Sequence, residues 1–121
     1  MILADTSIWI DHLRGGARSR SLAERLEAND IACHAFVLGE LALGNLGPRR
    51  ANILSDLALL PTIATVPEPE VRAMVEAQRL FGVGIGWVDA HLVAAALAAH
   101  ATLWTFDAPL ERIATRLGID R

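Results

Sequence analysis

The sequence contains no lysine, a single cysteine (Cys33) and no long run of apolar residues. One cysteine excludes an internal disulfide and agrees with a reducing, cytoplasmic setting. The longest wholly apolar run, Leu92 to Ala99, is far shorter than the roughly 20 residues that a bilayer-spanning helix needs. No basic leader precedes an apolar stretch at the N-terminus, so we expect neither a signal peptide nor a membrane segment.

Because lysine is missing, arginine carries all of the positive charge of the chain apart from histidine and the N-terminus. All eleven basic residues are arginine, and they stand against fourteen acidic residues, for a net charge of −3. Proteins that bind nucleic acids are usually basic, so this balance argues against phosphate partners. However, arginine binds phosphate through a planar fork of donors, and a cluster of acidic metal ligands would account for the negative excess. Codon bias is the simpler explanation of the missing lysine.

The length of 121 residues and the hydrophobic content of 53% predict one globular domain, residues 1–121. Short apolar runs alternate with longer helical patterns, which is typical of an α/β fold with a parallel sheet. The predicted strands are residues 2–4, 31–34, 62–66 and 102–106. The predicted helices are residues 7–13 (with Ser7 as N-cap), 21–28, 36–46, 49–60, 68–80, 87–100 and 109–117.

Four acidic residues occupy positions that ordinary surface charges do not. Asp5 and Asp107 each follow a hydrophobic strand, at the end where open parallel sheets bind ligands. Glu40 and Asp89 each have apolar neighbours at helical spacing, which places them on the apolar faces of their helices. Burying an unpaired carboxylate costs several kcal/mol, so we expect these charges to be compensated.

A divalent cation is the simplest compensation. Mg²⁺ and Mn²⁺ prefer oxygen ligands and keep several waters, which suits a site built from carboxylates. Thr6 and Thr105 flank the acids and are candidates to hold water there. The structural alternative is a buried network of arginines and carboxylates without catalysis. Zinc is disfavoured because the four histidines show no metal-ligand spacing and Cys33 is alone.

Four short motifs contain these acids. In order along the chain they are Asp5-Thr6-Ser7-x-Trp9, Gly39-Glu40-Leu41-x-x-Gly44, Gly84-x-Gly86-x-x-Asp89-Ala90-x-Leu92 and Leu103-Trp104-Thr105-x-Asp107. Each motif is weak alone, but together they resemble the successive motifs of PIN-domain ribonucleases. The similarity is greatest to the VapC toxins of VapBC toxin–antitoxin modules, and only about residues 48–80 contribute little to it.

This resemblance implies a PIN-like three-layer fold, with a central parallel sheet flanked by helices and the four acids in one pocket. It implies hydrolysis of RNA phosphodiesters that depends on Mg²⁺ or Mn²⁺ and leaves a 5′-phosphate. Asp5, Asp89 and Asp107 would be metal ligands, and Glu40 a ligand or an orienter of the attacking water. The resemblance also implies a homodimer and a VapB-like antitoxin. Unlike many relatives, the chain has no further acid close after Asp107, although Glu111 is a possible substitute.

Three arginines beside Gly15 and Gly16, namely Arg14, Arg18 and Arg20, are candidates for RNA binding, and a solvated loop explains them equally well. A non-enzymatic alternative uses the same surface to bind RNA or a protein without cleaving it. A receiver or phosphatase-like enzyme would need a lysine near its phosphate, and the chain has none.

Overall fold

A four-stranded, wholly parallel sheet lies at the centre of the structure, a computed structural model that describes all 121 residues. Its strands are β1 (Ile2–Ala4), β2 (Ile31–His34), β3 (Thr62–Ile63) and β4 (Thr102–Trp104). They lie in the order β3-β2-β1-β4. The chain therefore moves outward from β1 to β3 and then crosses to the other side of β1. This confirms the predicted α/β fold with a parallel sheet.

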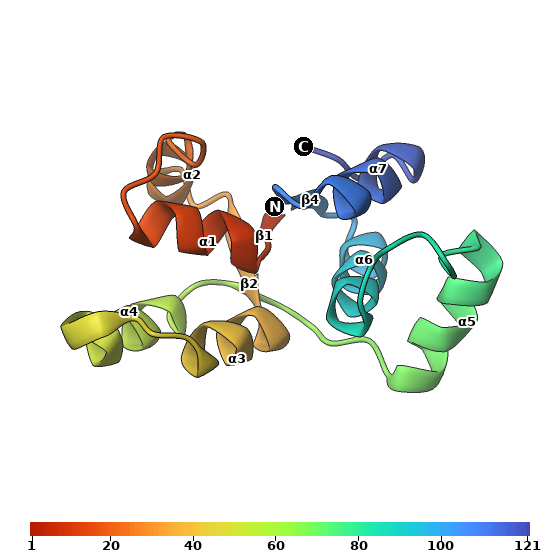
Figure 1. Ribbon diagram of the computed structural model, residues 1–121, viewed down its shortest axis with the longest axis horizontal. Coiled ribbons are helices and arrows are strands. Elements are labelled where there is room, and N and C mark those ends of the chain that lie inside the picture. The colour runs from red at the N-terminus through yellow and green to blue at the C-terminus, as the bar shows by residue number, and fades with distance from the viewer.

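Seven α-helices flank the sheet. They are α1 (Thr6–Leu13), α2 (Leu22–Glu27), α3 (Ala35–Leu43), α4 (Arg50–Leu57), α5 (Glu68–Gln78), α6 (Trp87–Ala99) and α7 (Ala108–Arg116), and the short 3₁₀ turn η1 (Gly47–Arg49) precedes α4. Figure 1 shows α1 to α4 on one side of the sheet and α5 to α7 on the other. Right-handed crossovers produce this arrangement, because the direction of travel along the sheet reverses after β3. The result is the expected three-layer fold.

Two strands are shorter than predicted, because the strand that each one pairs with has already ended. Thr62 and Ile63 pair with the last two residues of β2, and the chain turns into α3 directly afterwards, so the predicted strand 62–66 has no partner beyond Ile63. Similarly, Trp104 pairs with Ala4, the last residue of β1. The predicted strand 102–106 therefore stops two residues early, and residues 105 and 106 leave the sheet.

The helix ends also differ from the prediction, and two of these differences have a clear physical cause. Asp5, not Ser7, is the N-cap of α1, and its carboxylate accepts a hydrogen bond from the Ile8 amide at 3.2 Å. The third helix ends at Leu43 instead of residue 46, because Gly44 takes up an extended conformation. No helix is long and apolar enough to cross a membrane.

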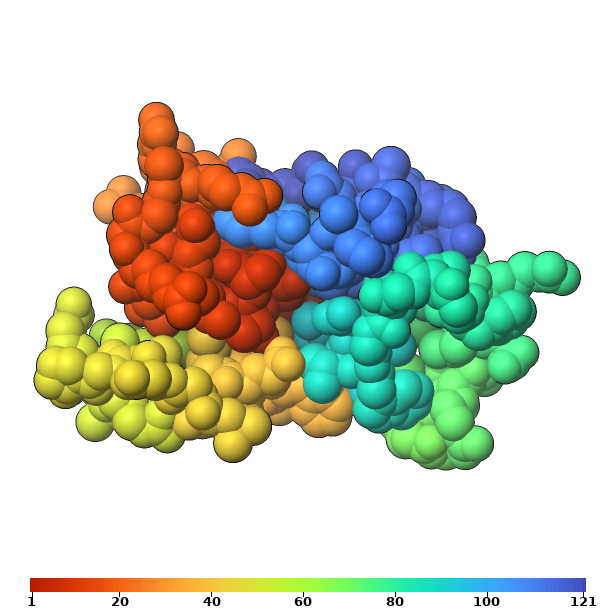
Figure 2. All heavy atoms as spheres, in the orientation of Figure 1, coloured from red at the N-terminus to blue at the C-terminus, as the bar shows by residue number.

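The carboxyl ends of β1 and β4 form the point at which the strand order reverses. Ligands of open α/β sheets bind at such a point. The strand interiors are fully buried: Leu3, Ala32 and Leu103 have at most 2% of their surface exposed. In Figure 2 the red N-terminal segment lies against the blue C-terminal segment, as the pairing of β1 with β4 requires. The fold thus brings residues 5 and 107 to one edge of the sheet.

Candidate functional site

Asp5 is the most deeply placed of the four acids. Only 5% of its surface is exposed, and its carboxylate is hydrogen-bonded on both oxygens. One oxygen accepts from the Ser7 hydroxyl at 2.5 Å and from the Ile8 amide, and the other accepts from the Thr105 hydroxyl. Burial raises the pKa of Asp5 above its ordinary value, and these hydrogen bonds partly oppose that rise.

The two hydroxyl groups that hold Asp5 are themselves held by the loop between β4 and α7. Ser7 Oγ accepts from the Phe106 amide at 2.9 Å, and Thr105 Oγ1 accepts from the Asp107 amide at 3.0 Å. Each hydroxyl therefore uses its proton on Asp5 and a lone pair on the loop. This network fixes the loop that carries Asp107 against the start of α1. The sequence indicated Thr105 as a supporting residue, but it did not predict that Ser7 and Thr105 together hold Asp5.

Asp107 lies at the other side of this network. It is the N-cap of α7, and its carboxylate accepts from the Leu110 amide at 3.1 Å. The side chain is exposed. Because Asp5 and Asp107 both cap helices that begin at neighbouring strand ends, the amino ends of α1 and α7 meet at the same edge of the sheet. The partial positive charge of helix amino ends favours carboxylates at these positions.

Asp89 reaches the site from the first turn of α6. Its carboxylate accepts from the Gly86 amide at 3.3 Å and is partly buried. Its pKa is raised first by burial and further by the negative charges of Asp107, Asp5 and Glu40, while the Gly86 hydrogen bond opposes the rise. The charges of the other three acids that the sequence singled out thus all act on Asp89, although the four come from separate segments of the chain.

Glu40 differs from the prediction. We expected it on a buried apolar face of its helix, but its side chain is exposed. The helix has an open flank here, because Leu43, one turn along, is 90% exposed. Glu40 instead accepts a hydrogen bond from the Thr6 hydroxyl at 2.6 Å. The cost of burial therefore applies to Asp5 and in part to Asp89, and not to Glu40.

No arginine neutralises these acids. The two ion pairs of the structure join Arg25 to Asp30 and Arg72 to Glu68, so the arginine–carboxylate network considered as a structural alternative is absent. Within α5, Arg72 pairs one turn back with Glu68. None of the four acids of the site forms an ion pair with a positive side chain.

The donor set suits a hard divalent cation, because it consists of carboxylate and hydroxyl oxygens without nitrogen or sulfur. No three acidic, histidine or cysteine side chains converge closely enough to form a complete set of metal ligands. Mg²⁺ needs no such set, since it keeps several waters and takes one or two carboxylates from a protein. The fit therefore rests on the chemistry of the donors and on their unbalanced charge.

The three arginines after α1 are separated by the fold. Arg14 lines a hollow together with Glu40, whereas the guanidinium carbon of Arg18 lies 4.0 Å from the centre of the Phe106 ring, next to Asp107. Arg20 is exposed. Asp11 orders this segment: its carboxylate accepts from the Ser19 amide at 2.9 Å. No sequence pattern predicts this role for Asp11.

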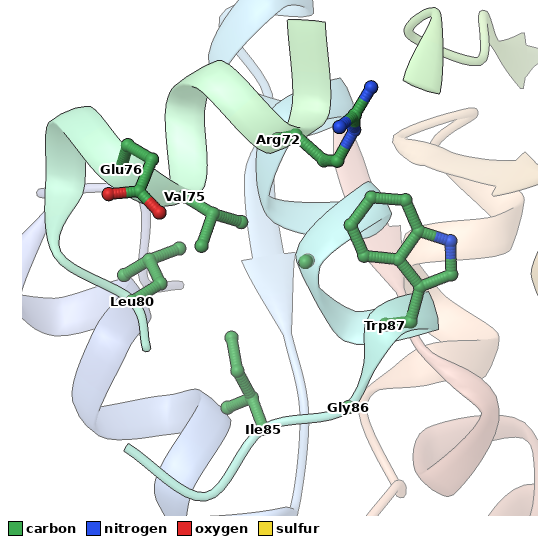
Figure 3. A pocket seen from close by; sticks show the side chains of 8 residues that line it. Arg72, Val75, Glu76, Leu80, Ile85, Gly86 and Trp87 are labelled. Atoms are coloured by element: carbon green, nitrogen blue, oxygen red, sulfur yellow. The ribbon is translucent and has the colours of Figure 1, made fainter. Parts of the chain in front are cut away.

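None of the four acids of the site lines the hollow between α5 and α6. That cavity of about 370 Å³ is bounded by apolar side chains such as Val75, Leu80 and Ile85, with Arg72 and Trp87 at its edge (Figure 3). Trp87 is 44% exposed, unlike the other two tryptophans, which are buried. Of the four acids, Glu40 and Asp107 are exposed, Asp89 is partly buried and Asp5 is buried.

Comparison with known proteins gives three results. The family model described as PIN domain matches residues 2–116. The chain is 42% identical over 120 residues to Ribonuclease VapC32 of two strains of Mycobacterium tuberculosis, covering 98% of this chain and 94% of the relative. The crystal structure of PAE2754 from Pyrobaculum aerophilum superposes with a TM-score of 0.64 over 97% of this chain and 94% of that chain. At 16% identity, this last likeness concerns the fold alone.

Proposed function

Because the chain belongs to the PIN-domain family, and within it to the VapC-type ribonucleases, we propose that it is a toxin-type endoribonuclease dependent on Mg²⁺ or Mn²⁺. Its substrate is RNA, and Asp5, Asp89 and Asp107 would hold the cation. Glu40 would bind the cation or orient the attacking water. The whole chain, residues 1–121, would form the single catalytic domain.

The observation that best supports this proposal is the unbalanced charge around Asp89. Burial raises the pKa of Asp89 most, the three other carboxylates raise it further, and no arginine is paired with any of the four. A protein that used these residues only for stability would gain by neutralising them. A group of acids left without a cation is instead the arrangement expected where a metal ion and a phosphate must enter.

The side chains divide the work according to how firmly each is held. Asp5 is fixed by three hydrogen bonds, so it would set the position of the cation. Asp89 and Asp107 reach the same edge from α6 and α7 and would complete the binding site. A bound Mg²⁺ would lower the pKa of water and neutralise phosphate charge. Glu40, exposed and held by Thr6, is free to accept a proton from an incoming water.

Direct attack by water is the simplest reaction here, since the chain has no lysine, Cys33 is buried, and the hydroxyls of Ser7 and Thr105 are engaged with Asp5 and with backbone amides. The water oxygen would bond to phosphorus as the bond from phosphorus to the 3′ oxygen breaks. The 3′ oxygen then takes a proton. The products would be a 5′-phosphate and a 3′-hydroxyl, as the family resemblance implies.

The proposal predicts that Asp5→Asn, Asp89→Asn and Asp107→Asn each lose cleavage of structured RNA by about a hundredfold or more. Losing a carboxylate ligand weakens both the charge and the geometry of a metal site. The matched control is Asp56→Asn, which removes an exposed carboxylate from α4 and should cleave like the wild type. Near wild-type turnover of any of the three at saturating Mg²⁺ would show that this residue is not a metal ligand.

The same premise extends to the partners. We propose that a VapB-like antitoxin inhibits the chain by covering the acidic edge, and that the chain forms a homodimer. Large apolar side chains exposed on the single chain, among them Leu43 at 90% and Phe81 at 57%, support contacts with other chains. The rival function, a module that binds RNA or protein without cleaving it, predicts binding that chelation abolishes and no new RNA ends.

A further inference from the structure

Two arginines lie over aromatic rings at the end of β4. The guanidinium carbon of Arg18 is 4.0 Å from the centre of the Phe106 ring, and that of Arg121 is 3.9 Å from the centre of the Trp104 ring. The two rings meet edge to face, with their centres 6.2 Å apart. Arg18, from the segment after α1, and Arg121, the last residue of the sequence, thus place two positive charges over one aromatic pair.

These arginines keep most of their hydrogen-bond donors free. Neither arginine forms an ion pair. Arg121 donates one hydrogen bond to the Ser21 hydroxyl at 3.0 Å, and Arg18 donates none from its side chain. A guanidinium attracted to the face of a ring keeps its N–H donors, and those without a partner remain available to a ligand. Such a group is fixed in position and still able to bind a phosphate with two parallel hydrogen bonds.

The stacked arginines line a pocket next to the acidic site. It has a volume of about 440 Å³ and is lined by Arg18, Trp104, Thr105, Phe106, Glu111 and Arg121. Glu111 contributes the only negative charge, so the pocket is positive in a chain whose net charge is negative. Thr105 connects the pocket to the acids, because its hydroxyl donates to Asp5 and accepts from the Asp107 amide.

We propose that this pocket binds an RNA phosphodiester next to the one that is cleaved, with Arg18 and Arg121 holding its oxygens. The inference rests on the proposed ribonuclease function. It also narrows the sequence-based hypothesis: of the three arginines after α1, only Arg18 is stacked at the site, and Arg121 joins it from the other end of the chain. The phosphate would guide the strand across the edge where Asp5 and Asp107 lie.

The test compares the double variant Arg18→Gln/Arg121→Gln with the control pair Arg79→Gln/Arg112→Gln, which removes the same charge from exposed positions outside the pocket. The probe is a labelled single-stranded RNA of roughly 12 nucleotides. Binding is measured across a salt gradient with Mg²⁺, in an Asp89→Asn background that prevents cleavage.

The double variant should bind the RNA about tenfold more weakly than the control pair. The slope of log K against log salt concentration should also become about 0.7 less steep, which is the value for one phosphate contact on a single strand. Replacing both arginines with lysine should restore the slope but only part of the affinity, because lysine lacks the planar fork. Equal affinity and slope in the double variant and the control pair would overturn the proposal and leave the pocket to a protein partner or to solvent.

Failure of the ribonuclease function would look different. If the wild-type chain cleaves no RNA but the double variant still loses affinity and slope, then the phosphate pocket stands and the catalytic proposal falls. If the wild type cleaves RNA and the double variant matches its control in binding, the catalytic proposal stands and the phosphate pocket falls. Melting temperatures of all variants show whether any loss comes from unfolding.

Discussion

Asp5 and Asp89 are the residues at which the proposed function conflicts with stability. In both, the folded-state pKa lies above the ordinary value of 3.8, with burial as the main cause. An acid with a raised pKa contributes stability that is fully present below pH 3.8 and is lost as the pH rises through the folded-state pKa. At neutral pH, without a cation, these ionised side chains therefore destabilise the fold.

The change Asp89→Asn should raise the melting temperature of the metal-free protein by a few degrees at pH 7. Asparagine keeps the oxygen that accepts from the Gly86 amide but removes the charge that three other acids repel. Thermal unfolding in EDTA measures the effect. Glu40→Gln is the control and should change little, because Glu40 is exposed and bonded to Thr6. A lower melting temperature for Asp89→Asn would mean that an unrecognised positive charge balances this carboxylate.

Thr105 gives a second test at the scale of single residues. Thr105→Val keeps the shape of the side chain but removes the hydroxyl that donates to Asp5 and accepts from the Asp107 amide. Leaving buried polar groups unpaired costs about 1–3 kcal/mol, and cleavage should fall because both acids lose their common support. Chemical denaturation and cleavage rates measure the two effects.

Two further variants separate the hydroxyl from the position. Thr105→Ser retains the hydroxyl and should keep most of the stability and activity. Thr102→Val makes the same change at the start of β4, where no side-chain hydrogen bond is lost, and it should be nearly neutral. If Thr105→Val proves as mild as Thr102→Val, the hydroxyl network does not hold the site.

At the scale of elements, α3 depends on a buried histidine. His34 ends β2 and is the N-cap of α3, and its Nδ1 accepts from the Phe36 amide at 3.0 Å. Burial, and secondarily the nearby His91, lower the pKa of His34 below its ordinary value of 6.5. Protonation would place a charge in the core and remove the acceptor that caps the helix carrying Glu40.

A depressed pKa means that the contribution of His34 to stability is complete above pH 6.5 and is lost as the pH falls through the folded-state pKa. The free energy of unfolding should therefore decline as the pH falls below 6.5. His34→Asn, which can still cap a helix but does not titrate, should make this decline shallower even though its smaller side chain lowers the overall stability. Urea unfolding at several pH values measures both slopes, and parallel slopes would contradict the account.

The element pattern shows how far the sequence predicts this fold. Every strand and helix was predicted in order, because apolar periodicity depends on burial. The ends were less accurate, since they depend on pairing: the predicted strand 62–66 stops at Ile63 because its neighbour β2 has already turned into α3. Either Asp5 or Ser7 could cap α1 by residue type. The choice depends on backbone geometry that the sequence does not show.

The same distinction applies to the site. Asp5 and Asp107 were predictable from strand ends, and the structure brings them together through Ser7 and Thr105. Glu40 was misplaced because periodicity shows which face of a helix is apolar but not whether another element covers it. The stacking of Arg121 on Trp104 joins distant segments, and no local pattern predicts such a contact.

At the scale of the whole molecule, the charge distribution links the two proposals. The chain has a net charge of −3, with unpaired acids at one edge of the sheet and two unpaired, stacked arginines beside them. Without a cation this edge would repel RNA, whereas a divalent ion would reverse the local field. Binding and cleavage of RNA are therefore expected to depend together on the metal.

One measurement tests the central claim most directly: the purified chain is incubated with structured RNAs in Mn²⁺, in EDTA, and in EDTA followed by excess Mn²⁺, and the new RNA ends are mapped. The account predicts discrete new ends bearing a 5′-phosphate in Mn²⁺, none in EDTA, and their return on adding Mn²⁺. Asp107→Asn, carried in parallel, excludes a contaminating nuclease. Cleavage that persists in EDTA, or that is equal in Asp107→Asn, would contradict a metal-dependent reaction at these carboxylates.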